Sequence, residues 1–141
     1  MFTCLKIYSD GGARGNPGPA AGAYLLLNEA DKIIKAQSIY LGKRTNNQAE
    51  YEALMAALEA AAAFGADEVL CHLDSELVCR QLTGQYRVKN ADLQKLWNKA
   101  RELSQRFKKI SFINVPRTNF YIQKADRLVN EKLDSLSANM R

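Results

Sequence analysis

The first 40 residues alternate between short apolar runs and turn-forming residues, which is typical of strands joined by hairpins. Residues 3–9 alternate apolar and polar side chains and predict a first strand. The glycine- and proline-rich segment 11–19 predicts a turn. Residues 20–27 and 32–40 predict two further strands with a short connection at residues 28–31. We therefore expect three consecutive strands linked by hairpins.

After residue 44 the apolar residues recur at helical spacing, interrupted by two short apolar strands. Thr45 and Gln48 have the spacing of a capping box, so a helix begins at Thr45 and runs to about Phe64, before Gly65. The remaining predicted elements are a buried strand at 68–73, a short helix capped by Ser75 and reaching Leu82, a helix with apolar residues from Leu93 to Phe107, a strand at 109–115, and a final helix whose apolar stripe runs from Ile122 to Leu136. This order predicts an α/β fold in which a mixed sheet carries helices on both faces.

Four carboxylates hold special places in this pattern, namely Asp10, Glu50, Asp74 and Asp126. Asp10 and Asp74 end predicted strands, whereas Glu50 and Asp126 lie on apolar stripes that face the sheet. Taken singly, each acid has an ordinary explanation, such as a turn, a helix cap or an ion pair. A charge on an apolar stripe is nevertheless costly unless it is paired or binds a metal. Four such acids predict one site, and a carboxylate-only site suits a hard cation such as Mg²⁺, so metal-assisted phosphoryl chemistry is the first hypothesis.

Composition adds expectations about size, partner and compartment. The 141 residues, 47% of them hydrophobic, predict one domain over residues 1–141. A net charge of +5 and a pI of about 9.2 favour a polyanionic partner, although a merely basic surface is the alternative. No apolar run is long enough to span a membrane and no signal peptide is evident, which favours a cytoplasmic protein. We expect Cys4, Cys71 and Cys79 to be buried free thiols rather than a disulfide framework or a zinc site, with a Cys71–Cys79 disulfide as the alternative.

Motifs around the four acids resemble those of type I ribonuclease H, in the family's order and over nearly the whole chain. They are YSDGGARGNPGPAAGAY, TNNQAEYEAL, LDSELVCRQLTGQYRVKN, and VPR followed by KADRLVNEKLD. The resemblance implies a five-stranded mixed sheet whose first three strands are antiparallel. It also implies a hydrolase, namely an endonuclease that cuts the RNA strand of RNA/DNA hybrids and leaves a 5′-phosphate and a 3′-hydroxyl. The implied cofactors are two Mg²⁺ ions, with Mn²⁺ as an alternative. The four acids would be its catalytic and metal-binding residues.

The resemblance also assigns roles to single residues. Asp10 would bridge the two ions, Glu50 and Asp74 would complete one ion, and Asp126 the other. The residues that the resemblance and their position assign to substrate binding are Gly11, Gly12, Arg14, Asn16, Thr45, Asn47, Gln48 and Ser75. Asn16, Asn47 and Gln48 would lie against the minor groove, where 2′-hydroxyl groups distinguish RNA from DNA. Thr45 and Asn47 would hold a DNA phosphate at a helix N-terminus, while capping alone is the alternative for Thr45 and Gln48.

The chain departs from the familiar family pattern in three places. No basic protrusion follows the third acid, because residues 86–90 lead directly to Asp92, as in the compact bacterial and archaeal members. No histidine lies between Pro116 and Asp126. Related sequences place an arginine seven residues and an asparagine four residues before the fourth acid, whereas Arg117 and Asn119 stand nine and seven residues before Asp126. Arg117 is our candidate for an assisting role.

Other residues near these motifs have a functional and a structural interpretation. We expect His72 to be a structural imidazole near the sheet, with a place beside Asp74 as the alternative. Trp97 continues an apolar helical stripe and is expected in the core rather than on a stacking surface. The loop residues Lys43, Arg44, Arg87 and Lys89 would contact phosphates or, alternatively, only solvate the surface.

Three classes of function remain in competition. The leading hypothesis is an endoribonuclease specific for RNA/DNA hybrids. A related nuclease is the second, either one that also cuts double-stranded RNA or a transposase-like enzyme, and the short chain argues against the latter. A non-catalytic hybrid-binding module is the third, and the presence of all four acids argues against it. We expect RNA/DNA hybrid as the partner, double-stranded RNA as a further one, no membrane association, and a monomer.

Overall fold

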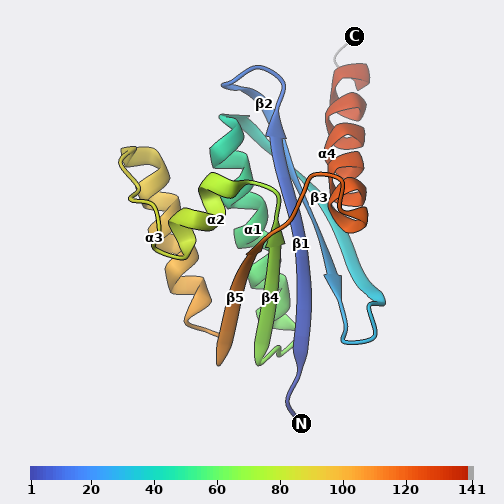
Figure 1. Cartoon of the computed structure of the whole chain (residues 1–141). Helices are drawn as coiled ribbons and strands as arrows, with labels where there is room; N and C mark the ends of the chain where they lie inside the picture. The colour runs from blue at the N-terminus through green and yellow to red at the C-terminus, as the bar shows by residue number, and fades with distance from the viewer. Residues whose placement is uncertain (140–141) are drawn as a thin grey trace.

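A computed structural model describes residues 1–139, which form one five-stranded sheet and four helices (Figure 1). In chain order the elements are β1 (Cys4–Ala13), β2 (Gly18–Leu27), β3 (Ile33–Arg44), α1 (Asn46–Ala63), β4 (Glu68–Leu73), α2 (Glu76–Leu82), α3 (Ala91–Ser104), β5 (Lys109–Asn114) and α4 (Phe120–Asn139). The predicted order of elements is confirmed. The last two residues of the predicted domain, 140 and 141, lie outside the described residues.

The sheet is mixed, with the strand order β3-β2-β1-β4-β5. Strands β1, β2 and β3 pair antiparallel, whereas β4 is parallel to both β1 and β5. The crossover through α1 allows β4 to return beside β1 in the same direction. The expected five-stranded sheet with three antiparallel strands at its start is therefore confirmed.

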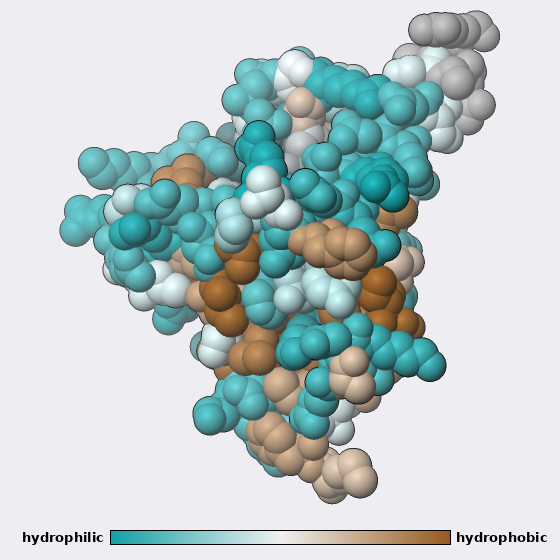
Figure 2. Space-filling model, turned by 45° about the vertical axis from the view of Figure 1, so that its right-hand side comes forward, coloured by the Kyte–Doolittle hydropathy of each residue, from teal (hydrophilic) through white to brown (hydrophobic). Residues whose placement is uncertain are grey.

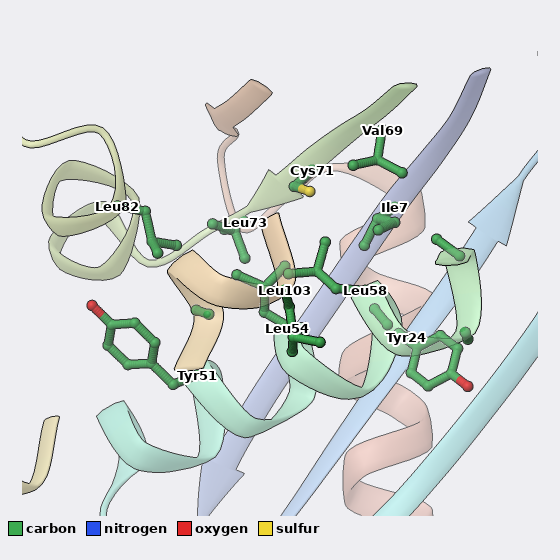
Figure 3. Packing of buried hydrophobic residues seen from close by; sticks show 14 of the residues in the cluster. Ile7, Tyr24, Tyr51, Leu54, Leu58, Val69, Cys71, Leu73, Leu82 and Leu103 are labelled. Atoms are coloured by element: carbon green, nitrogen blue, oxygen red, sulfur yellow. The ribbon is translucent and has the colours of Figure 1, made fainter. Parts of the chain in front are cut away.

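Helices cover both faces of the sheet, as predicted. On one face, Leu54 and Leu58 of α1 point toward Ile7 of β1 and Val69 of β4 (Figure 3). Helix α3 packs against α1 and extends this core. On the opposite face α4 packs over β1 and β2, where Ile122 is fully buried. Successive strand residues thus contribute to hydrophobic clusters on opposite faces of the sheet, because strand side chains alternate between faces.

Small residues allow α1 to lie directly on the β1–β2 hairpin. A Cβ atom placed on Gly11 would be 2.3 Å from the backbone carbonyl carbon of Ala49. A Cβ atom placed on Gly22 would be 2.8 Å from the Cβ atom of Ala53. Neither strand can carry a side chain at these contacts without moving the helix. This close approach brings the first turns of α1, and with them Glu50, against β1.

The first hairpin is longer than predicted. Its backbone ladder continues to the pair Ala13 and Ala20, so most of segment 11–19 is strand rather than turn. Asp10 consequently lies inside β1, and the prediction that it ends the strand is wrong. The parallel pairing of β1 with β4 stops at Tyr8 and His72, however, so Asp10 stands beyond the end of that pairing.

The α4 side is mainly hydrophilic in its upper part, with hydrophobic residues gathered lower down (Figure 2). The three cysteines are free thiols, as expected, and Cys71 and Cys79 are buried, whereas Cys4 is only partly buried. Trp97 is partly buried against the core, and its Nε1 donates to the Gln81 carbonyl at 3.0 Å, as expected of a structural residue. Within the described residues, no helix is both long and apolar enough to cross a membrane.

Candidate active site

Three of the four predicted acids meet beyond the end of the β1–β4 pairing. Asp10 comes from β1, Glu50 from the first turns of α1, and Asp74 directly follows β4. One carboxylate oxygen from each lies within 4.8 Å of the others. Asp10 and Glu50 are each only 7% exposed. The three acids line a cavity of about 430 Å³ that is open to solvent.

Asp126 lines the same cavity from α4, but it is not buried. The buried stripe of α4 runs through Ile122, Ala125, Val129 and Leu133. Asp126 follows Ala125 and is therefore rotated off this stripe toward the cavity, where it is exposed. The prediction that Asp126 lies on the inward stripe is wrong, although the four acids do surround one space.

The electrostatics of the cavity follow from burial and from the like charges within it. Burial raises the pKa of Asp10 to about 7, the adjacent Glu50 carboxyl group opposes this rise, and the charges of Asp74 and Asp126 add to it. Burial and the neighbouring Asp10 also raise the pKa of Glu50 well above its ordinary value. Two carboxyl groups placed this close together do not both ionise readily without a compensating positive charge.

The donor set fits a hard divalent cation. Glu50 Oε1 accepts a hydrogen bond from the Gly11 amide at 3.0 Å, which fixes the carboxylate against β1. Glu50 Oε2 is buried and has no hydrogen-bond partner in the described part of the chain. A buried oxygen without a donor is costly, and a cation would remove that cost. A set made only of carboxylates suits Mg²⁺ or Mn²⁺ better than metals that prefer nitrogen or sulfur ligands.

Arg117 reaches the acids despite the altered spacing of its loop. Its Nε lies 3.5 Å from Asp74 Oδ2, while the arginine side chain remains 91% exposed. His72 has a different position, since its Nδ1 is hydrogen-bonded to the Ile7 carbonyl at 2.9 Å. The imidazole also stacks on Tyr8, with ring centroids 4.2 Å apart. Burial lowers the pKa of His72, and its contacts are those of the expected structural imidazole.

Gly11, Gly12, Arg14, Asn47 and Ser75 line the acid cavity as well, so it holds five of the eight predicted substrate-binding residues. Lys43 and Arg44 are the last two residues of β3, so the prediction that they lie in a loop is wrong. Arg44 pairs with Glu52, whose Oε2 lies 2.9 Å from the arginine Nε.

A second cavity of about 220 Å³ brings together Asn16, Thr45, Asn47 and Gln48. Asn47 lines both cavities, so the two spaces adjoin at the start of α1. The capping box is present, with Gln48 N donating to Thr45 Oγ1 at 3.2 Å and Thr45 N donating to Gln48 Oε1 at 2.9 Å. Capping is thus confirmed for Thr45 and Gln48, and a contact of either residue with nucleic acid stays a prediction.

Three further polar residues, Asn46, Asn90 and Asn130, line these cavities although the sequence analysis did not assign them to the site. Asn46 N donates to Asn16 Oδ1 at 3.0 Å and Asn46 Oδ1 accepts from Ala13 N at 2.9 Å, which ties the hairpin to α1. Asn90 lines the second cavity and caps α3 by accepting from Leu93 N at 3.0 Å. An asparagine before an apolar helical stripe is an N-cap signal, so Asn90 could have been found. Asn130 lines the acid cavity from α4, and its place depends on tertiary packing.

A mixed sheet of order β3-β2-β1-β4-β5, with carboxylates gathered beyond the β1–β4 pairing, defines the ribonuclease H-like class of folds. Residues 8–132 match the family described as "Reverse transcriptase-like". Ribonuclease HI of Halobacterium salinarum is 48% identical over 131 residues, which are 92% of this chain and 64% of that relative. The chain therefore belongs to the type I ribonuclease H family.

Solved structures of related proteins agree. RNase H1 of the halophilic archaeon Halobacterium salinarum superposes with a TM-score of 0.90 at 45% identity, covering 94% of this chain and 98% of that one. LC11-RNase H1, solved in complex with an RNA/DNA hybrid, gives a TM-score of 0.87 at 40% identity, covering 94% and 98%. The chain spans 64% of the length of the curated Halobacterium relative and 36% of its curated mycobacterial relatives.

Proposed function

We propose that this chain is an endoribonuclease that hydrolyses the RNA strand of RNA/DNA hybrids and leaves a 5′-phosphate and a 3′-hydroxyl. The observation that carries the proposal is the convergence of Asp10, Glu50 and Asp74 in one open cavity. These acids occur in a chain of the type I ribonuclease H family, and a relative with a similar fold has been solved with a hybrid.

Asp10, Glu50 and Asp74 would hold divalent cations together with Asp126 from the rim, Mg²⁺ being the first candidate and Mn²⁺ the alternative. Such ions would supply Lewis-acid activation of a water and stabilisation of the negative charge that develops on the leaving oxygen of the phosphodiester. The protein itself supplies carboxylates that surround one cavity, where the Gly11 amide orients Glu50. Ser75 is not needed as a nucleophile, since its hydroxyl caps α2 by accepting from Val78 N at 3.2 Å.

The residues around the acids would place the nucleic acid. Arg117 presents an exposed guanidinium beside Asp74, where it can donate hydrogen bonds to a phosphate. Asn47 joins the acid cavity to the second cavity, so a hybrid lying across both would contact the start of α1. The chain is basic overall although its cavity is acidic, so its surplus positive charge lies elsewhere on the surface. Hybrid binding through phosphate contacts would then be independent of sequence and would weaken steeply with salt.

A panel of substrates tests this proposal. The protein is incubated with Mg²⁺ and an RNA/DNA hybrid, double-stranded RNA or double-stranded DNA of the same sequence. We expect cleavage of the RNA strand of the hybrid, and Asp10→Asn should abolish cleavage while hybrid binding persists. A wild-type protein that binds the hybrid and never cuts it would be a binding module. Cleavage of double-stranded RNA at a comparable rate would instead establish the broader nuclease.

A further inference from the structure

Three polar residues of α4 are spaced one turn apart and form a row that begins at the acid cavity. They are Asp126, Asn130 and Asp134. Asn130 Nδ2 donates to the backbone carbonyl of Asp126 at 3.1 Å and to its Oδ2 at 3.4 Å. At the far end of the row, Asp134 Oδ1 lies 2.6 Å from Nη2 of Arg14, which comes from the turn between β1 and β2. The same Nη2 donates to the Asn130 carbonyl at 3.3 Å.

Asp126 needs such support more than the other acids do. Asp10 and Glu50 are buried, and Glu50 is also held by the Gly11 amide. Asp74 is only 10% exposed and has Arg117 beside it. Asp126 is exposed, and its Oδ2 accepts a hydrogen bond from Asn130 Nδ2 at 3.4 Å. An exposed side chain loses rotamer freedom when it is ordered, so a neighbour that restricts it in advance favours binding.

We propose that Asn130 is a positioning residue that holds the Asp126 carboxylate at the cavity for cation binding. Arg14 and Asp134 fix this part of α4 against the β1–β2 turn. An amide suits this task because it donates a hydrogen bond without adding charge. A lysine or arginine would bring a positive charge that competes with the cation, and an aspartate would add a further negative charge. The inference rests on the proposed function only in taking the four acids as the cation site.

The test compares Asn130→Ala with Asn130→Gln, which keeps an amide, and with Asn98→Ala. Asn98 is an exposed asparagine within α3 that does not line either cavity near the acids, so it controls for the same substitution in a helix. Two quantities are measured for each protein. One is the MgCl₂ concentration that gives half of the thermal stabilisation in the absence of nucleic acid, and the other is the MgCl₂ concentration that gives half of the maximal hybrid cleavage.

Residues that orient a metal ligand change metal affinity by about tenfold to a hundredfold when they are removed. The Asn130 bond is long and exposed, so we expect a rise of about tenfold in both concentrations for Asn130→Ala. Asn98→Ala should match the wild type, and Asn130→Gln should recover most of the loss. Wild-type MgCl₂ dependence in Asn130→Ala would overturn the proposal, as would a glutamine variant that behaves like the alanine variant.

The two proposals fail in different ways. If MgCl₂ stabilises the wild type and Asn130→Ala weakens that effect, but no hybrid is cut, then the positioning role stands and the proposed function fails. If the wild type cuts hybrid and Asn130→Ala has an unchanged MgCl₂ dependence, then the function stands and the positioning role fails.

Discussion

The ionised forms of the Asp10 and Glu50 side chains are unfavourable in the folded protein when no cation is bound. The pKa of Asp10 is about 7 in the folded protein and 3.8 as an ordinary aspartate, so the folded state binds this proton more strongly than the unfolded chain. The contribution of Asp10 to the free energy of unfolding is therefore fully present below about pH 4, where the carboxyl group is protonated, and is lost as the pH rises through about 7. Ionising Asp10 thus destabilises the cation-free protein at neutral pH.

Replacing Asp10 by asparagine should accordingly raise the stability of the cation-free protein at pH 7 by about 1–3 kcal/mol, because asparagine does not ionise. Thermal unfolding in EDTA at pH 4 and at pH 7 measures the effect as the difference in Tm between Asp10→Asn and the wild type. The difference should be small at pH 4 and should grow toward pH 7. An equal Tm difference at pH 4 and pH 7 would show that the ionisation of Asp10 does not destabilise the folded protein.

Arg117 offers a second prediction at the scale of one side chain. Because it is 91% exposed, Arg117→Ala should leave Tm almost unchanged. The loss of its charge beside Asp74 and the substrate phosphate should lower kcat/KM for hybrid cleavage by about tenfold, or about 1.4 kcal/mol. Arg106→Ala, at an exposed arginine after α3, serves as the control. Equal kcat/KM values for the two variants would show that Arg117 does not assist hybrid cleavage.

Among the elements, the contact between α1 and β1 determines where Glu50 lies. An alanine at position 11 would place its Cβ 2.3 Å from the Ala49 carbonyl carbon, so α1 would have to move away from the strand. Gly11→Ala should therefore lower the free energy of unfolding by about 3 kcal/mol. Gly12 is the matched control, since the nearest atom to its Cβ would be Val129 Cγ1 at 3.9 Å. Denaturant unfolding of both variants measures the effect, and similar losses of stability would contradict the close contact.

Local patterns predict the elements better than the pairing between them. The capping box at Thr45 and Gln48 and the strand at 68–73 match the structure because their signals lie within a few residues of sequence. The extension of β1 to Ala13 depends on pairing with β2, which the glycine- and proline-rich composition of that segment conceals. The exposure of Asp126 depends on how α4 is rotated over the sheet, and helical spacing alone defines that rotation only to within about one residue.

For the whole molecule, the identity of the acids could be predicted from the sequence, whereas the cavities could not. Asp10, Glu50 and Asp74 come from three separate elements, and apolar periodicity together with the motifs indicates that they belong to one site. The positions of Asn90 and Asn130 along the cavity walls result from the packing of α3 and α4. The N-cap signal of Asn90 indicates a helix start and not a place at the site, and Asn130 carries no signal of its own, so only the assembled fold shows that both line the cavities.

The central claim is that the buried acids of this fold form a cation-dependent site that cuts the RNA strand of a hybrid. Glu50 and Glu59 lie on the same helix, but Glu50 is buried at the cavity and Glu59 is exposed. The most direct measurement is single-turnover cleavage of a hybrid with a labelled RNA strand, with and without EDTA, by the wild type, Glu50→Gln and Glu59→Gln. We predict Mg²⁺-dependent cleavage by the wild type and Glu59→Gln, and a loss of at least about a thousandfold in Glu50→Gln. Cleavage by Glu50→Gln at the wild-type rate, or cleavage that persists in EDTA, would contradict the claim.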